Sequence, residues 1–256
     1  MPREPGKVRL VGAGPGAADL LTVRALRAIE GAEALLYDAL ISDEVLALAP
    51  AACLKIQTGK RAGRPSLKQE TINRLMLRLA RRGLNVVRLK GGDPSIFGRV
   101  GEEAAFLHAH GIETEVVPGV TAASAAAAQF GFPLTHRGEA RRLLVATATT
   151  KEGALVGAGW SQAADPQTTV ALYMGRDRLE AALSQLMAHG RSAATPALAV
   201  ENAGRPEARV LPGTVGDLGA AVAAAGFDGP VVLIVGEVTA QAAAMAVTAP
   251  QQGAVG

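Results

Sequence analysis

The sequence predicts an α/β fold composed of two α/β domains. Short apolar runs of strand length alternate along the chain with segments of helical periodicity, a pattern typical of a mainly parallel sheet with helices on both faces. The chain has 256 residues, which is enough for two mid-sized domains. A polar stretch at Phe132–Arg141 interrupts the alternation. We therefore expect an N-terminal domain with glycine-rich loops over residues 1–134, a C-terminal domain over 135–240 and a mobile tail over 241–256.

The expected strands are short apolar runs, many of them bounded by glycine or polar residues. In the first domain they are Val8–Val11, Leu35–Tyr37, Lys55–Gln57, Val86–Leu89 and Glu115–Val117. In the second domain they are Leu143–Thr147, Val170–Tyr173, Ala197–Val200 and Val231–Val235. The second domain should also have helices over Leu179–His189 and Val215–Ala225, whereas Ala148–Asp165 is expected to be a long connection.

Helices in the first domain are predicted from capping residues and apolar faces. Asp19 or Thr22 would cap a helix with an inward face of Leu20, Val23, Leu26 and Ile29. Ser66 and Gln69 form a capping box for a helix with a shared face of Ile72, Leu75, Met76 and Leu79. Further helices are expected just after Ser42, over Glu102–His110 and over Thr121–Phe130.

Composition excludes several classes of protein. The chain is 49% hydrophobic and 19% charged, which are ordinary values for a globular protein. No run of about 18 strongly apolar residues would form a membrane span, and the N-terminus lacks the apolar core of a secretory signal. The single cysteine, Cys53, excludes an internal disulfide framework and a cysteine-clustered zinc site. We expect a cytoplasmic protein with no bound metal and no membrane partner.

Positive charge is concentrated in one segment. Between Lys55 and Arg99 the chain has twelve lysines and arginines against two acidic residues, a net charge of +10. Such a field attracts nucleic acid, phosphates or a small molecule with several carboxylates. Because aromatic residues make up only 3% of the chain and no stacking platform is visible, no nucleic-acid partner is expected. A solvated helix face is the simpler explanation for Arg74, Arg78, Arg81 and Arg82.

A glycine loop, Gly12–Ala17, follows the first expected strand. It matches the G-x-G-x-x-A fingerprint of dinucleotide-binding proteins, and Asp38 ends the next strand where a ribose-binding acid would lie. Pro15 removes one N–H donor from this loop, and the following helix starts late. Three interpretations stay open: a tight strand-to-helix turn, the dinucleotide site of an oxidoreductase, or a site for another ligand.

Similar loops follow the other strands of the first domain. Because the carboxyl ends of parallel strands meet at one edge of a sheet, these loops should line a common crevice in which a ligand binds. Gly91 and Gly92 would let a ligand approach the backbone, and Asp93, held extended by the following proline, would have a carboxylate free to orient. The loops are Thr58–Arg64, Lys90–Arg99 and Pro118–Ala122.

Taken together, the motifs in these loops resemble those of the tetrapyrrole methylase family. The resemblance extends from about Lys7 to Val238. The RLKGGDP run, the GKR triplet after the third strand and the PLTHR run resemble, more narrowly, the family members that methylate uroporphyrinogen III. The matching segments are Val11–Gly16, Tyr37–Asp38, Gly59–Arg61, Val87–Pro94, Phe97–Arg99, Pro118–Thr121 and Pro133–Arg137.

The resemblance implies a fold, a reaction and a cofactor. The family has two α/β domains with the active site in the cleft between them, and its members are usually homodimers. The implied activity is the S-adenosylmethionine-dependent C-methylation of uroporphyrinogen III, a polycarboxylate tetrapyrrole, at C2 and C7. This gives precorrin-2 via precorrin-1, for sirohaem or cobalamin biosynthesis, with S-adenosylhomocysteine as the second product. The alternatives are a methylase of a later precorrin and a dinucleotide-dependent oxidoreductase.

The resemblance also assigns roles to individual residues. Asp38 would accept a proton and Lys60 would donate one, with Arg99 as the alternative group for handling the proton. The substrate carboxylates would be bound by Arg61, Arg64, Arg99 and Arg137. The cofactor would be contacted through backbone hydrogen bonds of the glycines and through side chains, at Pro15, Gly91, Gly92, Asp93, Ile96, Thr121, Ala122, Met174 and Ala203. The chain departs from the usual family pattern at Ala39, Ser95 and Val100.

Overall fold

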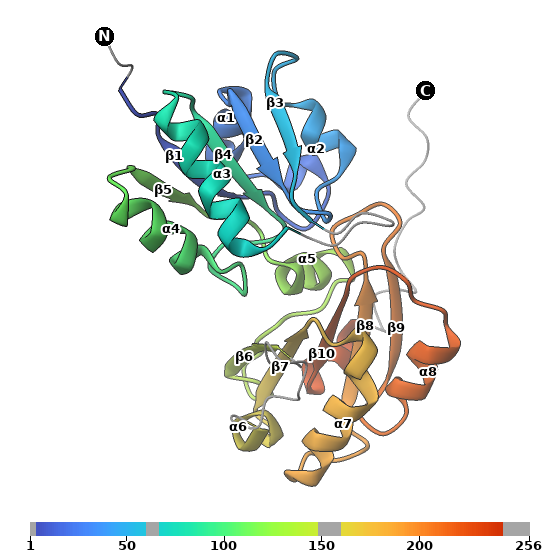
Figure 1. Cartoon of the computed structure of the whole chain (residues 1–256). Helices are drawn as coiled ribbons and strands as arrows, with labels where there is room; N and C mark the ends of the chain where they lie inside the picture. The colour runs from blue at the N-terminus through green and yellow to red at the C-terminus, as the bar shows by residue number, and fades with distance from the viewer. Residues whose placement is uncertain (1–3, 60–66, 148–159, 243–256) are drawn as a thin grey trace, which may run out of the picture. The chain divides into compact units, whose positions relative to one another are not determined.

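The computed structural model describes residues 4–59, 67–147 and 160–242 (Figure 1). Contacts divide the chain into a first unit, Met1–Ala122 with Gly204–Pro206, and a second unit, Ala123–Ala203 with Glu207–Gly256. This division falls earlier than the boundary expected after residue 134. Of the expected tail, only Gln241 and Ala242 lie within the described residues. Among the helices described, none has the length and apolar character that crossing a membrane requires.

The first unit is built on a five-stranded sheet in which every neighbouring pair is parallel. The strand order is β3-β2-β4-β1-β5, which places β1 and β4 side by side near the centre. All five strands expected from the sequence are confirmed, as is the parallel arrangement. Because the strands run in one direction, the loops that follow them leave from the same edge of the sheet. The strands are β1 (Val8–Gly12), β2 (Ala34–Tyr37), β3 (Leu54–Gln57), β4 (Val86–Lys90) and β5 (Thr114–Val117).

Helices cover both faces of this sheet, as the alternating pattern predicts. On one face α1 (Val23–Glu30) and α2 (Asp43–Ala47) pack against a core that includes Leu35 and Leu89. On the other face α3 (Gln69–Arg81) and α4 (Val100–Ala109) pack against a core that includes Leu10 and Leu36, and Figure 1 shows both helices in front of the sheet. Each fully buried leucine contributes about 1.5–3 kcal/mol to stability.

Thr22, not Asp19, caps α1. The Thr22 hydroxyl accepts a hydrogen bond from the backbone N–H of Ala25 at 3.1 Å, and Asp19 lies in a short 3-10 turn before the helix. The prediction that Val23 turns inward was wrong, since this side chain is 64% exposed. The buried face of the helix is Ala25, Ala28 and Ile29.

The predicted start of α3 was also wrong. The helix begins at Gln69 with Lys68 at the N-cap position, and Ser66, the expected cap, lies outside the described residues. The Gln69 amide points inward instead, and its Nε2 donates to Glu103 Oε1 at 2.9 Å and to Asn73 Oδ1 at 3.0 Å. The predicted apolar face is confirmed: Ile72, Met76 and Leu79 are buried and Leu75 packs against the same core.

The second unit has a mixed five-stranded sheet of order β6-β7-β10-β8-β9. Only β6 and β7 pair in parallel; the other three pairings are antiparallel. The four strands expected from the sequence are confirmed. The fifth, β9, was not predicted because it contains Pro212 and Gly213, residues that a strand tolerates at the edge of a sheet. The strands are β6 (Arg142–Thr147), β7 (Thr168–Tyr173), β8 (Pro196–Glu201), β9 (Arg209–Thr214) and β10 (Val231–Val235).

Three helices share an apolar core with the strands of the second sheet. The predicted helix α7 (Leu179–Ala188) is confirmed, and α8 (Leu218–Ala224) begins later than expected because residues before it form a turn. In that turn the Asp217 carboxylate accepts a hydrogen bond from Thr214 N–H. The helix α6 (Trp160–Ala164) lies in the stretch expected to be a connection. The remaining helix, α5 (Ala122–Gln129), matches the alanine-rich helix expected at Thr121–Phe130.

Arg88 and Lys90, which belong to the basic segment counted in the sequence, are buried within the first unit. Glu103 on α4 has no exposed surface, and both of its oxygens accept hydrogen bonds from Lys90 Nζ, at 3.0 and 2.9 Å. Arg88, on the same face of β4, reaches Glu103 Oε1 at 3.4 Å. Burial lowers the pKa of the Lys90 ammonium and Arg88 lowers it further, although Glu103 and Asp38 act in the opposite direction. Arg88 and Lys90 are therefore not part of a surface that attracts a polyanion.

We expect Glu103→Ala to lower the free energy of unfolding by about 3–5 kcal/mol, because it leaves two cations, Lys90 and Arg88, buried without their counter-ion. Urea denaturation followed by circular dichroism measures this change. Glu70→Ala is the matched control, because Glu70 forms an exposed pair with Arg74 that contributes about 0.5 kcal/mol or less. Equal effects of the two substitutions would contradict a special role for Glu103.

Candidate active site

Three backbone turns touch one another at the carboxyl edge of the first sheet. Gly14 and Gly92 exchange two hydrogen bonds, N–H to O at 3.2 and 2.7 Å. A β-carbon on Gly12 would lie 2.7 Å from Gly119 Cα and from Gly92 O. Only glycine permits this approach, so the turns after β1, β4 and β5 meet through their backbones. The predicted convergence is confirmed for the turns after β1, β4 and β5, whereas most of the expected loop Thr58–Arg64 lies outside the described residues.

Three N–H groups of the glycine loop after β1 are already bonded and are not available to cradle a pyrophosphate. The N–H of Ala13 donates to Lys90 O at 2.8 Å, that of Gly14 donates to Gly92 O, and that of Ala17 donates to Gly204 O at 2.9 Å. Helix α1 starts only at Val23, well after the last glycine. A dinucleotide site needs free N–H groups at a helix N-terminus, so the dinucleotide interpretation is wrong.

Open space lies beside Gly92. Its φ is +67°, and among the described residues, its two chain neighbours aside, no atom lies within 4 Å of the position that a β-carbon would occupy. The approach of a ligand to the backbone at Gly92 stays a prediction with which this space is compatible. The N–H groups that were expected to bond to a ligand already have partners within the protein. Gly91 N–H donates to Asp38 Oδ2 and Gly92 N–H donates to Gly14 O. These two N–H groups hold the loops together.

The Asp93 carboxylate is not free to orient, contrary to the prediction. Its Oδ1 accepts hydrogen bonds from the N–H, at 2.8 Å, and the hydroxyl of Ser95, and its Oδ2 accepts one from Gly119 N–H at 2.9 Å. Partial burial raises the pKa of Asp93, but the bonds from Ser95 and Gly119 outweigh it and leave the pKa below its usual value. Asp93 is thus an ionised group that ties the turn after β4 to the turn after β5.

Asp38 lies between the ends of β2 and β4, where the loops meet. Its Oδ1 accepts a hydrogen bond from Leu40 N–H at 2.9 Å and its Oδ2 accepts one from Gly91 N–H at 3.1 Å. The side chain is only half-buried, and each carboxylate oxygen has a second lone pair. Asp38 can therefore accept a further proton or hydrogen bond while it holds the two loops. The sequence did not indicate Leu40, whose side chain packs over Gly91.

Arg99 forms a two-point ion pair with its neighbour. It stands at the N-cap of α4 with a φ of +57°, and its guanidinium donates to both oxygens of Glu102, at 2.9 and 2.6 Å. The hydrogen bond to Glu102 raises the pKa of Arg99. The other predicted groups of the first unit, Lys60, Arg61 and Arg64, lie outside the described residues.

The remaining predicted contacts lie in the same loops or in the second unit. Pro15, Ile96, Thr121 and Ala122 are half-buried in the turns after β1, β4 and β5. In the second unit β7 and β8 both pair antiparallel with β10, so they run in the same direction. Met174, 58% exposed, and Ala203 therefore follow strands that end at the same sheet edge. Arg137 is exposed in the His136–Ala140 turn.

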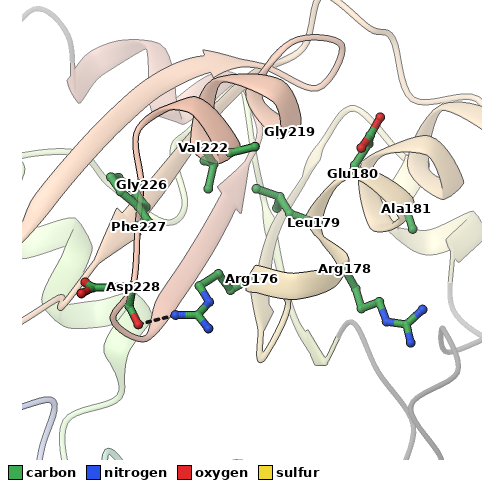
Figure 2. Close-up of a pocket in the computed structure, with 11 residues that line it drawn as sticks. Arg176, Arg178, Leu179, Glu180, Ala181, Gly219, Val222, Gly226, Phe227 and Asp228 are labelled. Atoms are coloured by element: carbon green, nitrogen blue, oxygen red, sulfur yellow. Dashed lines mark hydrogen bonds between the residues drawn. The ribbon is translucent and has the colours of Figure 1, made fainter.

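A cavity of about 640 Å³ lies within the second unit, and none of the predicted site residues lines it. It is bounded by the start of α7 and by the segment that follows α8. Figure 2 shows the Arg176 guanidinium donating to the backbone oxygen of Asp228, while Arg178 points away from that contact. The lining carries both signs of charge, including Glu180. The cavity and the loops that meet at the carboxyl edge of the first sheet share no residue.

Comparisons with known proteins give one family. Residues 7–219 match the family model described as Tetrapyrrole (Corrin/Porphyrin) Methylases. A uroporphyrinogen-III C-methyltransferase of Paracoccus denitrificans is 46% identical over 93% of this chain and 83% of its own. A siroheme synthase of Methylococcus capsulatus is also 46% identical over 91% of this chain, but this chain spans only about half of that protein (49%).

A solved structure leads to the same family. The uroporphyrin-III C-methyl transferase of Thermus thermophilus, complexed with S-adenyl homocysteine, has a TM-score of 0.77 and 40% identity. The match covers 92% of this chain and 100% of that one. The fold expected from the motifs, two α/β units, is thus shared with a solved relative. The chain belongs to the tetrapyrrole (corrin/porphyrin) methylase family.

Proposed function

We propose that the protein transfers methyl groups from S-adenosylmethionine to carbons of uroporphyrinogen III. The observation that carries the proposal is the meeting of three glycine turns beside the open face of Gly92, with Asp38 bonded to Gly91 at their edge. Relatives named uroporphyrinogen-III C-methyltransferase, similar over most of the chain, support the choice of substrate. On the family pattern we further propose methylation at C2 and C7, giving precorrin-2 via precorrin-1, by a cytoplasmic homodimer.

The chemistry of the loops suits S-adenosylmethionine better than an anionic cofactor. The N–H groups of Ala13, Gly14 and Ala17 are committed to carbonyl oxygens, so nothing there favours a phosphate. A sulfonium cation needs no N–H donors, and the carboxylates of Asp38 and Asp93 lie in adjoining turns. The open position at Gly92 leaves space for such a group. The proposed contacts are Pro15, Gly91, Gly92, Asp93, Ile96, Thr121 and Ala122, with Met174 and Ala203 from the second unit.

The substrate carries eight carboxylates, which matches the arginines in the loops. Arg61, Arg64, Arg99 and Arg137 are the proposed ligands, because arginine binds carboxylates through two parallel hydrogen bonds. Arg99 already makes such a pair with Glu102, so a substrate carboxylate would have to compete with this internal partner. The helix arginines are less suitable; Arg74, for example, is 71% exposed and pairs with Glu70.

When bound, S-adenosylmethionine supplies an electrophilic methyl group to a nucleophilic carbon of the macrocycle. The protein has to align the reacting atoms and to manage a proton. Asp38 is the proposed proton acceptor. Two N–H groups hold its carboxylate between β2 and β4, and each carboxylate oxygen has a second lone pair that these two bonds do not use. Lys60 is the proposed proton donor, and Arg99 is the alternative group.

The proposal is tested by incubating the full chain with uroporphyrinogen III and S-adenosylmethionine labelled in the methyl group. We expect two labelled methyl groups in the macrocycle and one S-adenosylhomocysteine released for each. Label that enters a later precorrin but not uroporphyrinogen III would contradict the choice of substrate. No transfer to any tetrapyrrole would contradict the proposed reaction.

We expect Gly92→Val to abolish the binding of S-adenosylhomocysteine, because the new side chain fills the open space beside the backbone. Calorimetric titration measures the affinity. Gly111→Val is the matched control: Gly111 also has a positive φ (+72°) and open surroundings, but it lies between α4 and β5 at the other end of the strands. Both variants carry the same backbone strain, so binding that survives in both would refute the placement of the cofactor.

We expect Asp38→Asn to slow methyl transfer by about 100-fold or more, because an amide cannot accept the proton. Affinity for S-adenosylhomocysteine should stay nearly normal, since the amide oxygen still accepts one of the two backbone hydrogen bonds. Steady-state kinetics and calorimetry separate the two effects, and Asp43→Asn on the exposed start of α2 is the control. Loss of cofactor binding with unchanged turnover at saturation would show that Asp38 binds the cofactor and does not accept the proton. The same pattern is expected for Lys60→Ala.

A further inference from the structure

A short segment from late in the chain is packed into the first unit. Gly204–Pro206 groups with residues 1–122 by its contacts. The carbonyl of Gly204 accepts the N–H of Ala17 at 2.9 Å. Gly204 has a φ of +79°, and a β-carbon on it would overlap the ring of Pro15. The segment is therefore in direct contact with the glycine loop after β1.

The side chain of Arg205 continues this contact as far as the turn after β2. Its aliphatic part lies against Gly16, where a β-carbon would overlap Arg205 Cγ. Its guanidinium donates from Nη2 to the backbone oxygen of Leu40 at 2.7 Å. A charged donor on a carbonyl makes a stronger hydrogen bond than a neutral one. Arg205 thus links the loop after β1 to the turn that follows Asp38.

Leu40 connects Arg205 to Asp38, because it bonds to both residues. The N–H of Leu40 donates to Asp38 Oδ1 at 2.9 Å, and its side chain packs over Gly91. Asp38 Oδ2 in turn accepts the N–H of Gly91 at 3.1 Å. Ala39 and Leu40 are themselves exposed, so the turn has little core packing of its own to hold it. The turn lies against the backbone of Gly59, where a β-carbon would overlap Ala39 N. Asp38 and Arg205 add polar contacts to this packing.

We infer that Arg205 is a positioning residue, which holds the Asp38–Leu40 turn against the Gly91–Gly92 turn. This inference rests on the proposed function, in which Asp38 accepts a proton. With the guanidinium in place, the Leu40 carbonyl is fixed, and with it the N–H that orients the Asp38 carboxylate. Without it, Asp38 keeps its acceptor atoms but loses its fixed orientation. A misplacement of this kind affects the chemical step more than the binding of cofactor.

The test compares three variants of the full chain. Arg205→Met keeps the aliphatic packing on Gly16 and removes the donor, Arg205→Lys keeps one charged donor, and Arg74→Met removes an exposed arginine from α3 as the control. We expect Arg205→Met to lower kcat by about 10- to 100-fold, with the affinity for S-adenosylhomocysteine and the KM values changed by about twofold or less. Arg205→Lys should recover part of the loss, and Arg74→Met should behave as the wild type.

Hydrogen exchange provides a second measurement that needs no substrate. In Arg205→Met, the peptides containing Leu40 and Gly91 should exchange about tenfold faster or more, because the two N–H groups bonded to Asp38 lose their fixed acceptor. The same peptides should be unchanged in Arg74→Met. Unchanged exchange with normal kcat in Arg205→Met would overturn the inference. A loss of cofactor affinity as large as the loss of kcat would also overturn it, because Arg205 would then act on cofactor binding and not on the orientation of Asp38.

The two proposals fail in different ways. A wild-type protein that methylates no tetrapyrrole counts against the proposed function, and the exchange measurement then decides whether Arg205 holds the Asp38 turn. A wild-type protein that is active, with an Arg205→Met variant of normal kcat and normal exchange, counts against the inference alone. Circular dichroism of each variant establishes that it is folded, and Arg205→Lys, which preserves the charge on a slightly shorter side chain, replaces Arg205→Met if the latter does not fold.

Discussion

The candidate site depends on the backbone contact between Gly12, Gly92 and Gly119. A β-carbon on Gly119 would overlap the carbonyl of Gly92, and one on Gly12 would press on both. This closeness lets Asp93 reach the N–H of Gly119 from the neighbouring turn. A larger residue at Gly12 or Gly119 would push the turns apart and break that bond, whereas a β-carbon at Gly92 would point into open space. The constraint is therefore steric, and the polar contacts are its consequence.

Both aspartates of the site accept hydrogen bonds from backbone N–H groups. Asp93 uses both oxygens to join the turns after β4 and β5, and Asp38 uses both to join the turn after β2 to that after β4. Strand ends that have no side-chain core between them are thus held together by carboxylates. The same arrangement places negative charge beside the open face of Gly92, which favours a cation there.

The basic residues of the first unit divide into groups with different roles. Arg88 and Lys90 lie buried around Glu103, beneath the turn that carries Gly91. Charges buried in this way add little net stability but are costly to leave unpaired, so the cluster links β4 to α4 through Glu103. Arg74 faces solvent on α3, as the simpler explanation of that helix predicted. The arginines in the strand-end loops form the third group, which we proposed above as ligands of a polyanionic substrate.

The sequence by itself determined nine of the ten described strands, the parallel first sheet, the turn glycines and the family, because periodicity and glycine spacing act over a few residues. Only the tertiary structure decided which polar groups of the site already have hydrogen-bond partners within the protein. Asp93 is 26 residues from Gly119, and Arg205 is 165 residues from Leu40, so no local pattern reveals those bonds. The same reason explains why the capping role expected of Gln69 was wrong, since its side chain turns to Glu103 on another helix. It also explains why β9, with Pro212 and Gly213, needed a neighbouring strand to become one.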